Sequence, residues 1–500
     1  MTKIQSQFED YVRRIQHFQE ALSLMAWDLR TGAPKKGVEA RAEAIGTLSD
    51  EVFGLMTSSR MGEFLEALEA RAHGLDGRTA ALVRECRREY DRNRRIPRER
   101  YRAFVVLTAK AESVWEDARN RNDFALLQPY LEEIVAMTRE FAGYWGYEKD
   151  PYDPLLDLYE PGVRTAEIDP LFATLREATV ALVGEIAESG RRPDPGVFAR
   201  PVPVETQQRI CRWALKTIGY DFDRGRLDET AHPFQITLNA GDVRVTTKYV
   251  VEDFRSALFS AFHEGGHALY EQGIDPDLAG TPLYAGASLG VHESQSRFWE
   301  NVVGRSRAFW EHYYGELTKR LGPAWNDLDI ETFYAGINDV RPSPIRTEAD
   351  EVTYNLHILL RYELERALIS GDLKVADLPE AWREKTRAFL GFEPNRDADG
   401  VLQDVHWASG SFGYFPTYTL GNVYAAQFWE AMDRDLGGFD RRLAEGDVAA
   451  VREWLREKVH RPGRELQPHE VLKRATGTDR PAAEPLLRYW REKFGPLYGL

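Results

Sequence analysis

The stretch FRSALFSAFHEGGHALYEQG, Phe254–Gly273, is the most informative segment of the chain. Its apolar residues recur at helical spacing, which predicts a buried helix over this range. These residues are Leu258, Phe262 and Leu269. On a helix, His263 and His267 are four residues apart and therefore project from the same face. Two neutral imidazoles in this arrangement can bind one Zn²⁺ ion, so both histidines are candidate metal ligands.

Glu264 follows the first of these histidines and completes the pattern His-Glu-x-x-His, which is typical of zinc peptidases. Zinc lowers the pKa of a water molecule toward ~7, and a neighbouring carboxylate can accept the proton as that water attacks a carbonyl. The alternative interpretation is a pair of core histidines. Against it, Gly265 and Gly266 each cost roughly 1 kcal/mol relative to alanine inside a helix. That cost is tolerated where a substrate or a neighbouring segment approaches the backbone closely.

A catalytic zinc site requires a third protein ligand and one open position. Glu293 is our candidate, because it lies at the start of a second helix that we expect to begin near His292. That helix is rich in Val, Phe and Trp, which indicates that it is buried. Glu300, two turns further on the same face, and Glu271, one turn beyond His267, are rival candidates.

The composition excludes several other classes of function. Of 500 residues, 43% are hydrophobic, which is ample for a large core, and the net charge of −15 disfavours nucleic acid or an anionic membrane surface as a partner. Two distant cysteines, Cys86 and Cys211, form neither a disulfide framework nor a Cys-x-x-Cys metal site. The segment MTKIQSQFEDYVRRIQ is amphipathic and lacks the apolar core expected of a signal peptide, and no run of 18 apolar residues occurs. We therefore expect a soluble, cytoplasmic protein without a membrane partner.

Most of the remaining chain shows helical periodicity, including a helix expected over 165–188. The one credible β region comes directly before the histidine helix, where Gln235–Asn239 and Asp242–Val250 can pair as a hairpin. Residues 189–203 contain four prolines and form the best internal linker. A break over 409–421 combines Gly, Pro, Phe and Tyr, and such an aromatic loop either packs in the core or lines a site.

Several spaced motifs together resemble the carboxypeptidase Taq family of zinc metallocarboxypeptidases, and the similarity runs nearly from end to end. The motifs are Met25-Ala26-Trp27-Asp28, His232-Pro233-Phe234, Asp242-x-Arg244-x-Thr246, HEGGHALYEQG with His292-Glu293-Ser294, Ile345-Arg346-Thr347-Glu348-Ala349-Asp350, and Gly400-x-x-Gln403-Asp404-x-His406-Trp407.

The resemblance implies a mainly α-helical zincin with a deep groove, similar to neurolysin-like and angiotensin-converting-enzyme-like peptidases, with one small hairpin or sheet beside the zinc helix. It implies one catalytic unit over residues 1–500, with a helical cap at about 1–145 and a zinc-site core at about 203–425. It further implies a homodimer that removes single C-terminal amino acids from peptides. In this family the Glu of the HES motif is the third ligand, which falls on Glu293.

The resemblance also suggests roles for residues outside the zinc helix. Related peptidases use a His and a Tyr to stabilise the oxyanion, which points to His406 and Tyr418, with Tyr414 as a competitor. His292 is a candidate for orienting one of the metal-binding side chains through a hydrogen bond, without contacting the metal itself. The substrate-binding candidates taken from the matching motifs are His232 and Gln403.

An exopeptidase must also recognise a terminal carboxylate, which the planar guanidinium of arginine binds through two hydrogen bonds. Arg346 is our candidate for this role, or for limiting substrate length, and Arg244 is the alternative. The competing interpretation is a salt bridge from Arg346 to Glu348 or Asp350.

Two alternative functions compete with the carboxypeptidase, and the number of metal ligands disfavours the second of them. An oligopeptidase or dipeptidyl carboxypeptidase would use the same zinc site but release dipeptides or internal fragments. A non-catalytic helical protein with structural zinc requires a closed site with four ligands, whereas only three are convincing here. A His₂Glu donor set does not select strictly for Zn²⁺, so Co²⁺ or Mn²⁺ are possible substitutes.

Overall fold

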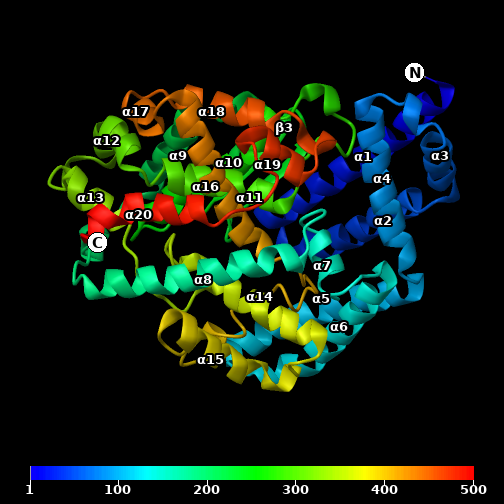
Figure 1. Cartoon of the computed structure of the whole chain (residues 1–500), viewed down its shortest axis with the longest axis horizontal. Coiled ribbons are helices and arrows are strands. Elements are labelled where there is room, and N and C mark those ends of the chain that lie inside the picture. Colours follow the sequence, from blue (N-terminus) through cyan, green and yellow to red (C-terminus); the bar gives the residue numbers. More distant parts are fainter. Residues whose placement is uncertain (1) are drawn as a thin grey trace. The chain divides into compact units, whose positions relative to one another are not determined.

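The computed structural model describes residues 2–500, and helices make up most of the chain (Figure 1). This confirms the mainly helical fold class. The chain divides into two compact units of three segments each: Met1–Arg94, Asp194–Ile337 and Ala425–Arg480 form the first, and Arg95–Pro193, Asn338–Tyr424 and Pro481–Leu500 form the second. The first boundary inside the chain lies at Arg94, and the next, at Pro193, lies within the proline-rich segment. The groove, the cap over 1–145 and the core over 203–425 stay predictions.

The first unit contains the small sheet and the helix with both candidate histidines. Its elements are α1 (Lys3–Thr31), α2 (Val38–Met56), α3 (Ser59–Glu69), α4 (Gly77–Arg95, which ends at the boundary), α9 (Val204–Ile218), β1 (Leu227–Glu229), β2 (Gln235–Asn239), β3 (Asp242–Thr247), α10 (Phe254–Gly273), α11 (Leu289–Arg297), α12 (Arg307–Leu321), α13 (Ile330–Ile337), α17 (Phe439–Ala444), α18 (Val448–Leu455) and α19 (Pro468–Thr476). A π-helical turn, Phe298–Val303, continues α11.

Within the described residues, the second unit contains helices and connecting loops but no strand. It consists of α5 (Arg98–Arg121), α6 (Phe124–Trp145), α7 (Asp153–Asp157), α8 (Thr165–Glu188), α14 (Tyr354–Ser370), α15 (Leu378–Leu390) and α20 (Glu484–Tyr498). One further helix, α16 (Pro416–Leu436), begins in the second unit and ends in the first.

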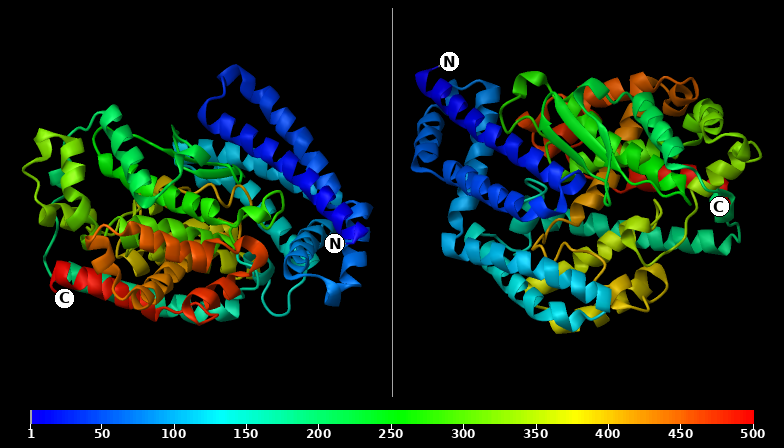
Figure 2. Two further views of the ribbon diagram at one scale, coloured as in Figure 1. Left: turned by 90° about the horizontal axis from the view of Figure 1, so that it is seen from above. Right: turned by 180° about the vertical axis from the view of Figure 1, so that it is seen from behind.

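The sheet has the strand order β1-β3-β2, with β3 at its centre. Strands β2 and β3 pair antiparallel, as the predicted hairpin requires, and the register shifts between Thr237 and Asn239. Strand β1 pairs parallel with β3 and was not predicted, because three residues are too short to show alternation. Figure 2 shows the strands in green beside α1 in blue.

Helix α10 has the bounds that its apolar spacing predicts, and it is almost entirely buried. The side chain of Asp253 caps its N-terminus by accepting a hydrogen bond from the backbone N–H of Arg255. The helix packs against α9, α11 and β3 within the first unit. A helix covered on several sides holds its side chains in fixed directions, which suits it to present two metal ligands.

Three boundaries differ from the sequence-based expectations. Strand β3 ends at Thr247 because the backbone oxygens of Val250 and Val251 accept hydrogen bonds from Gln207 and Val202 instead of continuing the ladder. Helix α11 begins at Leu289, three residues before His292, and the predicted break over 409–421 ends where α16 begins at Pro416. Proline is favoured in the first turn of a helix, so its presence there does not extend the loop. Within residues 2–500, no helix has both the length and the apolar character needed to cross a bilayer.

Candidate metal centre and a second polar cluster

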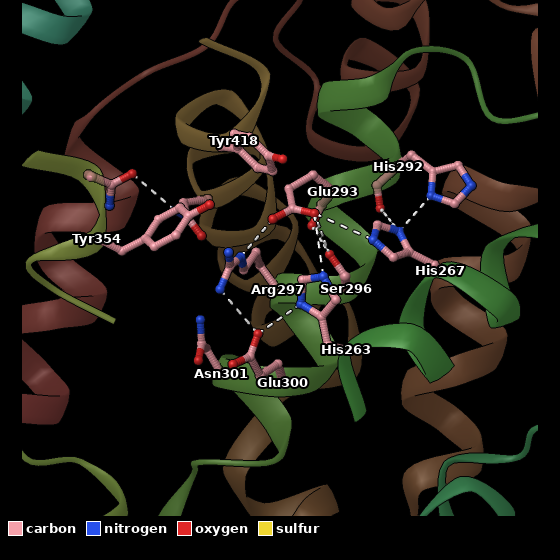
Figure 3. Close-up of polar contacts among 12 residues, drawn as sticks. His263, His267, His292, Glu293, Ser296, Arg297, Glu300, Asn301, Tyr354 and Tyr418 are labelled. Carbon is pink, nitrogen blue, oxygen red and sulfur yellow. Dashed lines mark hydrogen bonds and ion pairs between the residues drawn. The ribbon is translucent and has the colours of Figure 1, made fainter. Parts of the chain in front are cut away.

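The structure brings His263, His267 and Glu293 together in the first unit, and their ligand atoms all lie within 4.8 Å of one another. The Oε2 atom of Glu293 is 3.8 Å from Nε2 of His263 and 3.5 Å from Nε2 of His267 (Figure 3). Helix α10 supplies both histidines and α11 supplies the glutamate. Two imidazole nitrogens and one carboxylate oxygen are a donor set that suits a catalytic divalent metal with an open position.

The two glycines of the motif allow neighbouring helices to approach α10. A Cβ atom added at Gly266 would lie 2.4 Å from the backbone oxygen of Gln295 and 2.7 Å from Cα of Ser296, both on α11. A Cβ atom at Gly265 would meet Leu215 of α9 at 2.7 Å. The two glycines therefore allow the close approach of neighbouring segments that their helix-destabilising effect predicts. At Gly266 the approaching segment is α11, which carries Glu293.

We expect Gly266→Ala to weaken metal binding at least tenfold and to lower the free energy of unfolding by about 1–3 kcal/mol, because the new methyl group must push α11 away from α10. The measurement is a chelator competition together with thermal unfolding. Gly315→Ala is a matched control, because Gly315 lies in α12 and a Cβ atom there meets nothing within 4 Å. A Gly266→Ala protein with unchanged metal affinity would show that the close approach does not set the site.

Of the rival ligands, Glu300 contacts the far side of His263, whereas Glu271 contacts His292, which in turn contacts the far side of His267. Oε2 of Glu300 is 2.9 Å from Nδ1 of His263, the ring nitrogen on the side away from Glu293. Nε2 of His292 is 3.0 Å from Oε1 of Glu271, and the rings of His292 and His267 meet through their Nδ1 atoms at 2.6 Å. Because Nδ1 of His263 and Nδ1 of His267 are both engaged in these contacts, the Nε2 atoms of the two rings remain available for a metal.

Arg297 connects the third ligand to Glu300. Its Nε donates to Oε1 of Glu293 at 2.7 Å, and its Nη1 donates to Glu300 at 3.1 Å. Ser296 donates to Oε2 of Glu293 at 2.9 Å. These contacts hold the Glu293 carboxylate in one orientation. The π-helical turn that contains Glu300 follows directly, and π-helical turns are frequent at functional sites.

The charges around the triad set its protonation. Burial alone would raise the pKa of Glu293, but Arg297 and the two histidines hold that pKa well below its ordinary value. For Glu300, burial also raises the pKa, but Arg297, His263 and Arg305 lower it to about 2. Burial lowers the pKa of His267 to about 4. An ionised glutamate and a neutral histidine are the forms in which these side chains bind metals.

Glu264 is the one carboxylate of the centre without a strongly cationic neighbour. Its side chain is only 7% exposed. Burial raises the pKa of Glu264, His263 opposes this rise, and the nearby charges of Glu293 and Glu300 add to it. Together these effects place the pKa at about 7. A carboxylate with a pKa near neutrality is suited to accept a proton and later return it.

The second unit holds a separate buried cluster centred on Asp404. Its Oδ1 accepts from Nε and Nη2 of Arg346 at 3.0 and 2.7 Å, and its Oδ2 accepts from Nε of Arg361 at 2.7 Å. The salt bridge of Arg346 therefore has another partner than Glu348 or Asp350. The carboxylate of Asp350 instead accepts hydrogen bonds from Thr353 and from the backbone N–H of Arg341.

The oxyanion candidates lie beside this cluster. Nε2 of His406 is 3.5 Å from the hydroxyl of Tyr418, and its Nδ1 is 3.9 Å from Oδ1 of Asp404. The ring of Tyr414 lies 5.4 Å from that of His406. Burial lowers the pKa of His406 to about 4, although Asp404 opposes this, so the imidazole is neutral at pH 7. The side chain of Gln403 accepts from the backbone N–H of Arg346 at 2.9 Å.

Glu365 anchors the loop that carries His406. Its carboxylate is fully buried and accepts hydrogen bonds from the hydroxyl of Tyr152, from Nε1 of Trp407 at 2.7 Å and from the backbone N–H of Gly413 at 3.0 Å. The aromatic loop is thus packed in the core of the second unit and also carries candidate site residues. Burial outweighs the three donors and raises the pKa of Glu365 to about 7.

This shift predicts a pH dependence of stability. Because the folded pKa lies above that of an unfolded glutamate, the protonated form stabilises the folded state below pH ~4.5, and the stabilisation is lost as pH rises through about 7. We expect Glu365→Gln to remove a decline on the order of 3 kcal/mol between pH 4 and 8, measured as unfolding free energy against pH. The exposed Glu384→Gln is the control. Identical pH profiles for Glu365→Gln and wild type would contradict the prediction.

The remaining substrate-binding candidates lie in the first unit. Arg244 pairs with Asp242 through Nε at 2.8 Å and Nη2 at 2.6 Å, and its guanidinium lies 4.4 Å from the ring centroid of Trp27. His232 is exposed in the loop before β2, whereas the backbone N–H of Phe234, two residues on, donates to Thr246 at 2.8 Å. Neither residue belongs to the group of three metal-ligand candidates.

Three residues that the structure places in these sites have no role predicted from the sequence: Arg297, Asp404 and Glu365. A signal exists for Arg297, which lies four residues after Glu293 and so can pair with it on one helix face. Glu365 lies among charged residues of α14, between Glu363 and Arg366, so the sequence gives no signal that this acid is buried with fixed partners. For Asp404 the signal is weak, because its arginine partners are distant in the sequence.

Comparisons with known proteins agree with this geometry. The family described as Carboxypeptidase Taq (M32) metallopeptidase matches residues 7–494. Carboxypeptidase 1 of Bacillus subtilis is 47% identical over 494 residues, which cover 99% of this chain and 98% of that protein. Thermostable carboxypeptidase 1 of Thermus thermophilus is 46% identical over 488 residues, with 95% of each chain covered.

Solved structures show the same relationship. The crystal structure of the M32 carboxypeptidase from Deinococcus radiodurans R1 superimposes with a TM-score of 0.97 at 39% identity and covers 100% of both chains. The family model matches nearly all residues, and two relatives of known name are more than 40% identical to this chain. Together these findings establish the family. The chain is therefore a peptidase that belongs to the carboxypeptidase Taq (M32) metallopeptidase family.

Proposed function

We propose that this peptidase is a zinc-dependent metallocarboxypeptidase that removes single amino acids from the C-termini of peptides with broad specificity. The observation that carries the proposal is the group His263, His267 and Glu293, with Glu264 adjacent to it on the same helix. We further propose that the protein is cytoplasmic and a homodimer, the latter to be tested by light scattering at several concentrations.

A bound zinc ion would supply Lewis acidity toward the substrate carbonyl and a lowered pKa for water, and the chain's own residues would do the rest. His263, His267 and Glu293 would hold the ion, and hydrogen bonds from Ser296 and Arg297 fix the orientation of the Glu293 carboxylate. Glu264 accepts the proton of the attacking water and then delivers it to the leaving amine.

We propose catalytic roles for candidate residues of the second unit. His406, as a neutral N–H donor, and the hydroxyl of Tyr418 would stabilise the developing oxyanion, with Tyr414 as the alternative tyrosine. Each such donor is worth about 3–4 kcal/mol in acyl-transfer enzymes. Gln403 would position Arg346 through its backbone hydrogen bond.

For the terminal carboxylate of the substrate, Arg346 and Arg244 stay the candidates, with His232 as a further contact. Both guanidiniums are already paired with an aspartate, which fixes their planes before a substrate binds. Arg346 uses Nε and Nη2 for Asp404, while its Nη1 contacts the hydroxyl of Tyr354 at 3.2 Å. That Nη1 edge is the part of Arg346 that we propose for substrate recognition.

The test is a mass-spectrometric time course on an N-terminally blocked peptide of eight residues, with metal-loaded protein, with chelator, and with chelator followed by Zn²⁺. We expect a ladder that loses one C-terminal residue at a time, stops with chelator and resumes with Zn²⁺. Dipeptide products or internal cuts would replace the proposal by a dipeptidyl carboxypeptidase or an oligopeptidase. Restoration by Co²⁺ or Mn²⁺ but not Zn²⁺ would overturn the choice of metal.

A further inference from the structure

A chain of hydrogen bonds runs from His267 away from the metal-ligand group and ends on Glu271. Nδ1 of His267 lies 2.6 Å from Nδ1 of His292 (Figure 3). The other nitrogen of His292, Nε2, lies 3.0 Å from Oε1 of Glu271. Glu271 is 4% exposed, so the chain ends in the interior of the first unit. Two imidazoles in series thus separate a buried carboxylate from the metal site.

The partners in this chain allow one consistent set of proton positions. The backbone oxygen of His292, which can only accept, lies 3.1 Å from Nδ1 of His267. This Nδ1 therefore carries the proton, and Nε2 of His267 keeps its lone pair for a metal. Since an N–H at Nδ1 of His292 would then meet another N–H at 2.6 Å, that nitrogen must be an acceptor. The proton of a neutral His292 consequently lies on Nε2 and is donated to Glu271.

The surroundings hold each member of the chain in place. Oε1 of Glu271 also accepts from the backbone N–H of Gly286 at 3.1 Å, and Oε2 accepts from the hydroxyl of Thr237 at 3.1 Å. The ring of Tyr270 lies 5.2 Å from that of His292. A Cβ atom at Gly286 would be 2.8 Å from Cδ2 of His292, so glycine leaves the room that this ring occupies.

We propose that Glu271 and His292 are positioning residues that act as a relay, in which Glu271 keeps the proton of His292 on Nε2 and thereby keeps Nε2 of His267 free to bind the metal. The inference rests on the proposed metal site. Without Glu271, the Nδ1–H form of His292 becomes accessible, and its proton opposes the metal-binding form of His267. Glu300 serves His263 directly, whereas Glu271 acts on His267 through a second ring.

The first test is ¹⁵N NMR of histidine-labelled wild-type protein loaded with Zn²⁺. We expect His267 to be protonated on Nδ1 and His292 on Nε2. The second test is a chelator competition for Zn²⁺, in which Glu271→Leu should bind Zn²⁺ about 10–100-fold more weakly than wild type. Glu271→Gln should recover most of that loss, because its amide oxygen can still accept the proton of His292.

Thr237→Val is the matched control, because it removes another hydrogen bond of Glu271 but leaves the contact with His292, and its affinity should change less than threefold. A proton on Nδ1 of His292 in the wild type, or a wild-type affinity in Glu271→Leu, would overturn the relay. Should Glu271→Leu fail to fold, the NMR result and Glu271→Gln decide. Failure of the proposed function looks different: wild type would not bind one Zn²⁺ per chain, or His263→Ala would bind it unchanged.

Discussion

Replacing Glu264 by glutamine is expected to lower kcat by about a hundredfold to ten-thousandfold while the protein still binds one metal ion per chain. Glutamine has nearly the same shape but cannot accept a proton, so the substitution removes the proposed base and leaves the site geometry in place. The side chain is buried beside the triad but is not one of its three ligands. The measurements are peptide-hydrolysis kinetics, metal analysis and thermal unfolding of the same preparation.

The exposed Glu252, just before α10, provides the matched control for this substitution. Glu252→Gln removes the same carboxylate charge from the same unit and should retain the wild-type kcat. If Glu264→Gln kept its metal and full activity, another residue would have to be the base. If it lost the metal, Glu264 would contribute to metal binding, and the kinetic result would not report on proton transfer.

The sequence predicts the histidine pair well because its geometry is local. Four residues along one helix fix the relative directions of His263 and His267, and the apolar spacing that predicts α10 gives its observed bounds. The same holds for α8, expected over 165–188 and observed at Thr165–Glu188. In contrast, β1 pairs parallel with β3, where Leu227 lies opposite Val245, 18 residues further along the chain, and no local pattern reports such a pairing.

Distinguishing the third ligand from its rivals depends on more than spacing. Glu271 and Glu293 are buried and Glu300 is partly buried near the histidines, and helical periodicity alone leaves all three glutamates open as the third ligand. The π-helical turn at Phe298–Val303 changes the number of residues per turn just where Glu300 lies. Side-chain direction then places Glu300 on Nδ1 of His263 instead of among the three ligand atoms. In the sequence, the buried helix expected from near His292 already favours Glu293, and the resemblance strengthens that choice over its rivals.

The partner of Arg346 shows the other limit of sequence reasoning. The competing interpretation of Arg346 pairs it with the acids nearest in sequence, Glu348 or Asp350, yet Asp404 takes that position from 58 residues away. Reasoning from sequence favours nearby acids as ion-pair partners, because such pairs can form without any tertiary contact. In the folded protein, a buried guanidinium is paired with the carboxylate that the core supplies, since leaving either charge unpaired is costly.

For that reason Asp404→Asn is expected to lower the free energy of unfolding by about 3–5 kcal/mol. The side chain of Arg361 is fully buried, that of Arg346 is 8% exposed, and Asp404 is the carboxylate between them. An asparagine oxygen can accept from one guanidinium, but its amide group then faces the other with donors against donors. The measurements are denaturant unfolding and hydrogen exchange, which should accelerate most within residues 338–424 of the second unit.

Asp397→Asn is the matched control, because Asp397 forms a partly exposed ion pair with Arg383 at 3.3 Å and its loss should cost less than about 1 kcal/mol. The double variant Asp404→Asn with Arg361→Met should regain part of the lost stability, since it removes the buried charge that the single variant leaves unpaired. A single variant as stable as wild type would mean that water or another group compensates both guanidiniums. In that case the charge of Asp404 would be retained for the orientation of Arg346 and His406, and a fall in kcat/KM without a fall in stability would reveal it.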